Sequence, residues 1–177
     1  MLKEKPKSKS VVVVFKAWVN HLILLYTPYN SCRLYKGLHP SLLRSLTLQG
    51  YRIPTPIQRL SIPALLLNPP RDLVGMARTG SGKSLAYMVP LIQRLGGRHS
   101  TTFGARALIL LPTRELALQI MKVGKELARA FSNGLGEHAG DKPQVDSTKS
   151  QNLRWGLVVG GEGLDEQFEM ITSNPDV

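Results

Sequence analysis

Ala77-Arg-Thr-Gly-Ser-Gly-Lys-Ser84 is the stretch that decides the fold of this chain. It departs from the phosphate-binding P-loop pattern G-x-x-x-x-G-K-S/T only at its first position, where Ala77 stands in place of glycine. Residues 72–76 before it are typical of a short strand, and residues 83–95 after it are typical of a helix. In that setting the amides of residues 79–83 can surround an anion at a helix N-terminus, where the helix dipole favours negative charge.

The side chains of this loop have different tasks. Gly80 and Gly82 allow backbone conformations and approach distances that a Cβ would block. Lys83 is expected to reach the β- and γ-phosphates of a nucleotide, and Ser84 to ligate Mg²⁺ through its hydroxyl. An ordinary Gly/Ser loop could match the pattern by chance, but the flanking strand and helix favour the P-loop. The candidate nucleotide-binding residues of the loop are Ala77, Arg78, Thr79, Gly80, Ser81, Gly82, Lys83 and Ser84.

Outward from the loop, the hydrophobic pattern alternates between strands and helices. A helix is expected from Pro40 until Gly50 ends it, and another over residues 57–67, which Pro63 should kink or split. The further expected elements are strands at 72–76, 106–111 and 155–159 and helices at 83–95, 114–130 and 164–172, the second of these capped by Thr113. The repeated strand-helix order predicts an α/β fold, with a parallel sheet and helices on both faces.

Two polar segments interrupt this order. Residues 96–104 form a short connection, and residues 132–154 are rich in Gly, Asp, Lys and Ser without hydrophobic periodicity. The second segment exceeds the roughly 12 to 15 residues usual for a connection without secondary structure. Its composition offers little to bury, which favours a disordered insertion over a functional loop.

The N-terminal residues 1–32 differ from the rest. A basic stretch, residues 1–10, precedes an apolar run from Val11 to Tyr26 that Lys16, Asn20 and His21 interrupt. This order imitates a signal or anchor, but the run is shorter than the roughly 20 apolar residues that span a bilayer, and no small-x-small cleavage site follows. We expect no membrane association. An extra buried element, or sequence from a misjudged gene start, explains the segment better, and a membrane-anchored P-loop protein is a third, less favoured class.

Length and charge narrow the class of protein. The 177 residues suffice for one domain with a hydrophobic core, and the single Cys32 excludes an internal disulfide. The sequence shows no cluster of metal-ligating residues. A formal net charge of +11 favours a polyanionic partner, because Lys and Arg neutralise phosphates and release their counterions. Charge alone does not choose among RNA, DNA and anionic lipid.

Upstream of the P-loop, the stretch Gly50-Tyr-Arg-Ile-Pro-Thr-Pro-Ile-Gln58 places a glutamine amide in a proline-stiffened turn. An amide can bond bidentately to the N6 and N7 edge of adenine, which selects ATP over GTP. By itself such a residue is more often a surface glutamine. In front of a P-loop, Gln58 becomes a candidate adenine-binding residue.

These motifs together resemble a known family. Thr55-Pro-Ile-Gln58 resembles the Q motif of DEAD-box RNA helicases, and residues 77–84 resemble their motif I, which has Ala at its first position. Pro112-Thr-Arg-Glu-Leu-Ala117 resembles their motif Ia, and Gly160-Gly161 resembles their GG pair. The four motifs stand in the family's order, and the resemblance extends over residues 37–177. The sequence around the motifs is most similar to the nucleolar ribosome-biogenesis branch of the family.

The resemblance implies an incomplete RecA-like P-loop NTPase domain. It divides the chain into the atypical segment 1–32, a Q-motif region 33–61, and a truncated first helicase ATP-binding domain 64–177 that contains the insertion. It also implies an ATP-dependent RNA helicase that uses ATP and Mg²⁺, meets pre-ribosomal particles in the nucleolus and serves ribosome biogenesis and rRNA processing. Tyr51, Thr55 and Gln58 join the loop residues as expected nucleotide contacts.

The resemblance also implies an RNA-binding side. Its residues are Pro112, Thr113, Arg114, Glu115, Gly160 and Gly161. Arg114 follows a strand's carboxyl end, where open α/β sheets bind ligands. Contacts to phosphates read no sequence, so the binding should be non-specific and sensitive to salt. A surface ion pair from Arg114 to Glu115 or Glu126 is the alternative.

Two departures from the family limit these expectations. Arg33 stands near the place of the usual adenine-stacking aromatic residue, with Tyr29 and Tyr35 as possible substitutes. The sequence lacks the Asp-Glu-Ala-Asp motif, and we interpret Asp165, Glu166 and Glu169 as a solvated helix face. We therefore expect weak ATP binding at best and negligible turnover by this chain, as for a fragment of a longer helicase. The alternative is a short, non-enzymatic isoform that binds ATP, RNA or helicase partners.

Overall fold

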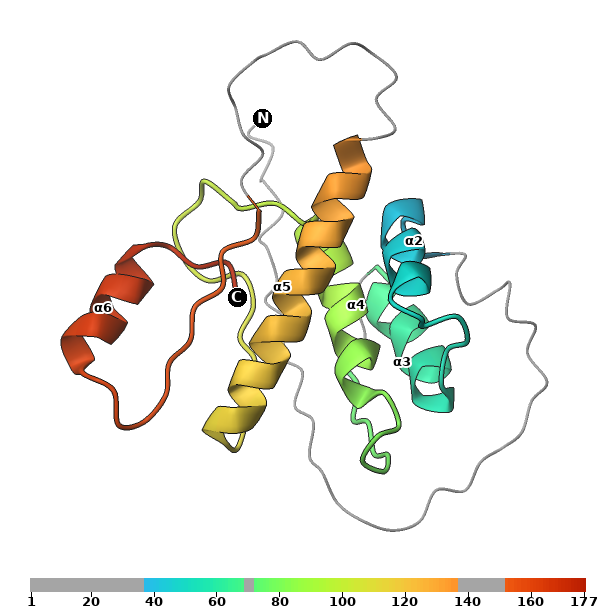
Figure 1. Cartoon of the computed structure of the whole chain (residues 1–177), viewed down its shortest axis with the longest axis horizontal. Helices are drawn as coiled ribbons and strands as arrows, with labels where there is room; N and C mark the ends of the chain where they lie inside the picture. Colours follow the sequence, from blue (N-terminus) through green and yellow to red (C-terminus); the bar gives the residue numbers. More distant parts are fainter. Residues whose placement is uncertain (1–36, 69–71, 137–151) are drawn as a thin grey trace, which may run out of the picture.

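The computed structural model describes residues 37–68, 72–136 and 152–177. These ranges contain the following helices, which Figure 1 labels: α2 (Pro40–Leu48), α3 (Pro56–Leu66), α4 (Lys83–Leu95), α5 (Arg114–Gly136) and α6 (Leu164–Thr172). The predicted helices are all present, and α4 and α6 have the predicted bounds. The expected insertion begins too early, because α5 continues through residues 132–136. Residues 137–151 and the N-terminal segment 1–36 lie outside the described residues.

Local sequence signals account for the helix boundaries. Pro40 occupies the first turn of α2, and the chain leaves that helix at Gly50, whose φ of +89° suits glycine. Thr113 caps α5 as predicted, since its Oγ1 accepts a 3.3 Å hydrogen bond from Leu116 N. Pro63 lies inside α3 without splitting it.

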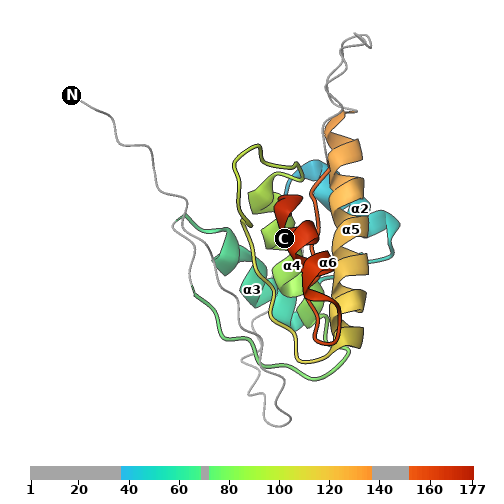
Figure 2. The ribbon, with the colours of Figure 1, turned by 90° about the vertical axis from the view of Figure 1, so that its left-hand side faces the viewer.

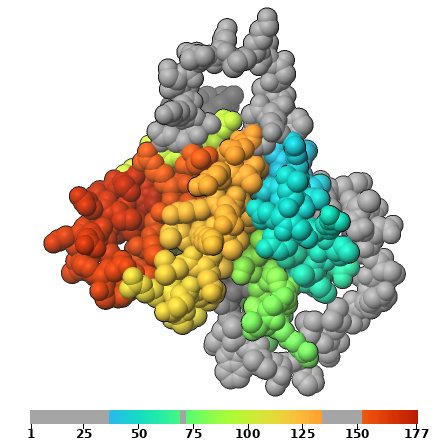
Figure 3. Space-filling model, viewed as in Figure 1, coloured from blue at the N-terminus to red at the C-terminus, as the bar shows by residue number. Residues whose placement is uncertain are grey.

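The helices surround one apolar core. α3 packs on α4, α4 packs on α5, and α5 packs on α2. Leu42, Met88, Ile92 and Leu127 are fully buried between them. In the space-filling view α2 and α3 cover one flank of α5, while α6 and the segment before it cover the other (Figure 3). The core explains the intact α3, since Ile62 and Leu65 on either side of Pro63 are both buried.

The three predicted strands differ from expectation. Residues 72–76, 106–111 and 155–159 run without helical turns, but none of the described residues belongs to a β-strand, and an isolated antiparallel bridge joins Arg98 to Asn152. The predicted burial of the segment 106–111 is also wrong in part. Ala107 is buried, whereas Leu108 and Leu110 are 63% and 67% exposed.

The backbone at the end of the described chain explains why these segments do not pair with each other. Arg106 N and Ala107 N donate to the carbonyl of Asp176 at 2.9 and 3.0 Å. On the other side, Asp176 N donates to Arg154 O at 2.8 Å, and Gly156 N donates to Val177 O at 2.7 Å. Residues 176–177 therefore lie between the two segments. This places them about two inter-strand spacings apart, too far for a direct ladder.

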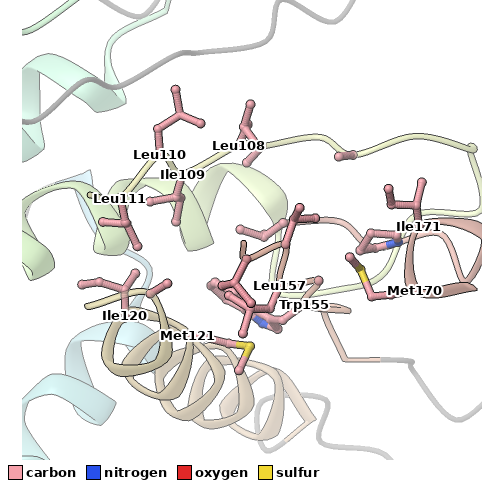
Figure 4. A pocket seen from close by; sticks show the side chains of 18 of the residues that line it. Leu108, Ile109, Leu110, Leu111, Ile120, Met121, Trp155, Leu157, Met170 and Ile171 are labelled. Carbon is pink, nitrogen blue, oxygen red and sulfur yellow. The ribbon is translucent and has the colours of Figure 1, made fainter. Parts of the chain in front are cut away.

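From Val177 towards the start of α5, the space between the two segments is an apolar groove of about 640 Å³ (Figure 4). Leu108 to Leu111 form one wall, and Trp155 and Leu157 form the other. Ile120 and Met121 of α5, with Met170 and Ile171 of α6, complete the lining. The groove has the width and the apolar lining that suit a buried strand.

Asp176 ties the connection 96–104 to this region. Its carboxylate is 1% exposed and accepts hydrogen bonds from Arg154 N at 2.9 Å and Ser100 N at 3.0 Å. It also lies 2.9 Å from His99 Nδ1 and 2.7 Å from Arg106 Nη2. Burial opposes ionisation, but these hydrogen bonds together hold the pKa of Asp176 below its usual range. The predicted surface connection is thus anchored at residues 99 and 100.

The described residues also bear on the other predicted classes. None of the helices in these ranges is long and apolar enough to cross a bilayer. The same ranges hold no group of three His, Cys, Asp or Glu side chains that could bind a metal ion. The apolar run 11–26 lies outside the described residues.

Candidate nucleotide and RNA site

The loops that precede α4, α5 and α6 lie at the same end of the molecule (Figures 1 and 2). They are the P-loop, the segment 112–113 and the Gly160-Gly161 turn. Each follows the carboxyl end of one extended segment, which is where open α/β folds bind their ligands. These three loops therefore bring together all the predicted motifs except the Q motif. The Q motif contacts the P-loop through the side chain of Gln58.

Two glycines shape the P-loop. Gly80 and Gly82 have φ angles of +78° and +84°, in the left-handed region that favours glycine. A Cβ at Gly82 would lie 2.4 Å from Gln58 Nε2, whereas a Cβ at Gly80 would meet no atom within 4 Å. The loop is thus packed on its Gln58 side and open at Gly80.

The two remaining functional groups of the loop are arranged to accept an anion. Lys83 Nζ donates to the carbonyls of Ala77 at 2.6 Å and Arg78 at 2.7 Å, so the ammonium is folded back onto the start of the loop. Ser81 Oγ is buried and has no hydrogen-bond partner among the described residues. A bound phosphate would supply acceptor oxygens for both groups. Ser84, in the first turn of α4, is half-buried at the same place.

Gln58 links the Q motif to the P-loop. Its side chain is buried, Oε1 accepts from Thr55 N at 3.0 Å, and Nε2 donates to the carbonyl of Gly82 at 3.1 Å. Thr55 Oγ1, beside Gly82, is buried without a hydrogen-bond partner in the part of the chain that the structure describes. Tyr51 is 47% exposed. Each end of the Gln58 amide therefore makes one hydrogen bond, which leaves the second N–H of Nε2 and the second lone pair of Oε1 for a further partner. Arg33, Tyr29 and Tyr35 lie outside the described residues.

The predicted RNA-binding segments meet through an ion pair. Arg114 Nη2 lies 2.8 Å from Glu162 Oε1, which joins the first residue of α5 to the residue after Gly161. The sequence suggested Glu115 or Glu126 as the alternative partner, and the structure shows Glu162 instead. Pro112, Thr113 and Glu115 are exposed beside it.

The GG turn is held by a residue that the sequence did not single out. Gln167 Nε2 donates to Val159 O at 3.1 Å and to Glu162 O at 3.2 Å, on either side of Gly160 and Gly161. Gly161 has a φ of +87°, and a Cβ at either glycine would meet no atom within 4 Å. Gln167 therefore fixes the backbone of the turn, while the space beside both glycines is open. In the sequence, the position of Glu162 directly after the GG pair is the one signal that could have identified this residue.

Comparison with known proteins agrees with these motifs. Residues 55–176 match the model of the DEAD/DEAH box helicase family. Over 141 residues the chain is 58% identical to the ATP-dependent RNA helicase DBP10 of Mycosarcoma maydis, a match that covers 80% of this chain and 12% of that protein. The DBP10 helicase of Cryptococcus neoformans var. neoformans serotype D is 52% identical over 141 residues, which cover 78% of this chain and 18% of the relative. The chain thus spans less than a fifth of either relative's length.

Solved structures show the same fold. The RNA helicase Prp28 from Chaetomium thermophilum bound to ADP superposes with a TM-score of 0.52 at 39% identity, covering 75% of this chain and 27% of that one. The yeast DEAD-box splicing factor Prp28 superposes with a TM-score of 0.65 at 28% identity, covering 85% of this chain and 32% of that one. The RecA-like α/β fold predicted from the sequence is confirmed. The match of residues 55–176 to the family model and the superposition on a solved RNA helicase agree that this chain belongs to the DEAD/DEAH box helicase family.

Proposed function

We propose that this chain is part of an ATP-dependent RNA helicase and supplies its adenine-nucleotide and RNA-backbone contacts on one side of the site. The observation that carries the proposal is the bonding between motifs: Gln58 is joined to the P-loop at Gly82, and Arg114 is joined to the GG loop at Glu162. Both of these contacts involve loops that lie at the same end of the fold (Figure 1).

The nucleotide is held by groups that are already directed at the loop. Lys83 exchanges its two carbonyl partners for β- and γ-phosphate oxygens, and Ser81 Oγ gains the hydrogen bond that it lacks. Ser84 ligates Mg²⁺ through its hydroxyl. When bound, ATP supplies the phosphoanhydride bond whose hydrolysis drives a helicase cycle. The residues of this chain bind and orient it.

Adenine selection falls to Gln58. Its amide oxygen can accept from adenine N6 and its nitrogen can donate to N7, a pairing that guanine does not offer. Gln58 can make it with its second N–H and second lone pair while it keeps its bonds to Thr55 N and Gly82 O. Recognition of the base is thereby coupled to the backbone of the P-loop, which supports a role for Thr55 and Tyr51 beside the base.

RNA lies against the other contact, where Arg114 meets the GG loop at Glu162. Arg114 and the open backbone of Gly160-Gly161 contact phosphates, so binding is independent of base sequence and weakens as salt rises. Pro112, Thr113 and Glu115 border the contact. We assign residues 33–61 to a Q-motif region and residues 64–177 to the first helicase ATP-binding domain, with α3 running across the boundary. Ribosome biogenesis in the nucleolus, on pre-ribosomal particles, is the role we propose for the longer protein.

Titration of labelled single-stranded RNA tests this function. The full chain should bind homopolymers of different bases with similar affinity, and Arg114→Gln should weaken binding about fivefold or more. Lys125→Gln, an exposed charge further along α5, serves as the matched control. Equal losses in the two variants would show a general charge effect and contradict the assignment of Arg114.

A further inference from the structure

The ion pair between Arg114 and Glu162 occupies the guanidinium that is proposed to hold an RNA phosphate, so the inference drawn from it rests on the proposed function. The two side chains are 54% and 33% exposed, and both are open to exchange with solvent or ligand. A carboxylate and a phosphate present similar oxygen pairs to a guanidinium, and each can bind it bidentately. One Arg114 cannot give its best geometry to both.

Both partners sit on backbone that is fixed. Arg114 is the first residue of α5, whose N-terminus is capped by Thr113. Glu162 lies in the turn that Gln167 holds by bonding to Val159 O and Glu162 O. The carboxylate is therefore presented to Arg114 by a built turn and is not carried there on a free loop.

We propose that Glu162 is an internal competitor of the RNA phosphate, which occupies Arg114 while RNA is absent and must be displaced when RNA binds. Each bound RNA then releases one carboxylate from Arg114. Glu162 is a positioning residue that lowers RNA affinity.

Two measurable consequences distinguish this from a structural ion pair. An exposed pair of this kind opposes a competing ligand by roughly twofold to fivefold in affinity, so Glu162→Gln should tighten RNA binding by about that factor. Salt dependence should change as well. In the wild type Arg114 already has a protein counter-charge, whereas in Glu162→Gln it attracts solution anions. Release of these anions adds to the cation release from RNA, so the slope of log affinity against log salt should be steeper in Glu162→Gln.

The experiment titrates the full 177-residue chain with a fluorescein-labelled single-stranded RNA decamer at several salt concentrations. The variants are Glu162→Gln, Arg114→Gln and the double variant, each with a thermal melt. Glu166→Gln is the matched control, because it removes an exposed carboxylate from the adjacent first turn of α6. Glu162→Gln should bind more tightly and with a steeper salt slope than Glu166→Gln, and it should add nothing in the Arg114→Gln background.

Each other outcome overturns a defined part of the account. Equal gains in Glu162→Gln and Glu166→Gln, or weaker binding with a lower melting temperature in Glu162→Gln, overturn the competitor role while the loss in Arg114→Gln leaves the proposed function standing. An Arg114→Gln variant that binds RNA as the wild type does, or a chain that binds no RNA in any form, overturns the proposed function and the competitor role together.

Discussion

Gln58 Nε2 donates a 3.1 Å hydrogen bond to the carbonyl of Gly82, which places the side chain of the Q motif directly against the P-loop. The two residues are so close that a Cβ on Gly82 would lie 2.4 Å from Gln58 Nε2. Gln58 is also 8% exposed, so the bond is shielded from water. Gln58, which we propose recognises the base, and the P-loop therefore form one structural unit.

Glu in place of Gln58 tests this unit. The substitution keeps the shape of the side chain but sets a carboxylate oxygen against the carbonyl of Gly82 and removes the donor to adenine N7. We expect affinity for ATP analogues to fall about tenfold and the preference for adenine over guanine to vanish, since a lost buried hydrogen bond of this kind costs about 1 to 3 kcal/mol. Competition binding with ATP and GTP measures both. Gln119→Glu, on the exposed side of α5, should behave as the wild type. Retained adenine preference in Gln58→Glu would contradict the role of the amide.

Asp176 should make the fold sensitive to acid. Its lowered pKa means that its contribution to stability is present above the usual pKa of 3.8 and is lost as the pH falls through the lowered value. Asp176→Asn should reduce the free energy of unfolding at neutral pH by about 1 to 3 kcal/mol, because Arg106 loses its carboxylate. As the pH falls through the lowered pKa of Asp176, the difference from the wild type should shrink. Denaturant titrations across pH test this, with the exposed Asp165→Asn as control, and a pH-independent difference would rule it out.

Gly124 marks the closest approach of α5 to Trp155. A Cβ at this position would lie 2.2 Å from Trp155 Cη2, and the indole is a rigid neighbour. Gly124→Ala should therefore destabilise the fold by about 1 to 3 kcal/mol despite the better helix propensity of alanine. Lys125→Ala, at the exposed neighbouring position, should change stability little. A Gly124→Ala variant as stable as the wild type would show that α5 and Trp155 are not packed in this way.

The apolar groove should promote self-association of the isolated chain. Leu108 and Leu110 are 63% and 67% exposed on a segment whose free backbone can pair with another chain. Replacing both with lysine should shift the chain towards monomer in light scattering at equal concentration. Leu118→Lys adds one lysine on α5, where Leu118 is 44% exposed, and should have a smaller effect than Leu108→Lys alone. Unchanged association in the double variant would show that another surface mediates self-association.

The sequence predicted what local chemistry determines. Helices α4 and α6 have their expected bounds because apolar periodicity marks both, with Gly82 and Gly96 at the two ends of α4 and Gly163 before α6. Residues 132–136 were assigned to the insertion wrongly, since packing of Leu127 and Phe131 in the core stabilises the preceding turns of α5 in spite of a polar end. Exposure of the segment 106–111 could not be predicted either. A strand is buried only when its neighbours are in place, and that depends on contacts between distant residues.

The same limit applies to the site. The motifs identified the P-loop, Gln58, Arg114 and the GG pair, because their chemistry is carried by consecutive residues. The partners that position them are distant in sequence: Gly82 bonds Gln58, Glu162 bonds Arg114, and neither pairing has a local signature. Only the fold brings them together.

We propose that the P-loop of this chain binds nucleotide through Lys83. Equilibrium titration of the full chain with a fluorescent ATP analogue and Mg²⁺, comparing the wild type with Lys83→Gln and with the exposed-lysine control Lys122→Gln, tests it most directly. Lys83→Gln should weaken binding at least about tenfold, as expected for a lost charge-assisted contact to phosphate, while Lys122→Gln should bind as the wild type does. Equal affinity of the wild type and Lys83→Gln would contradict it.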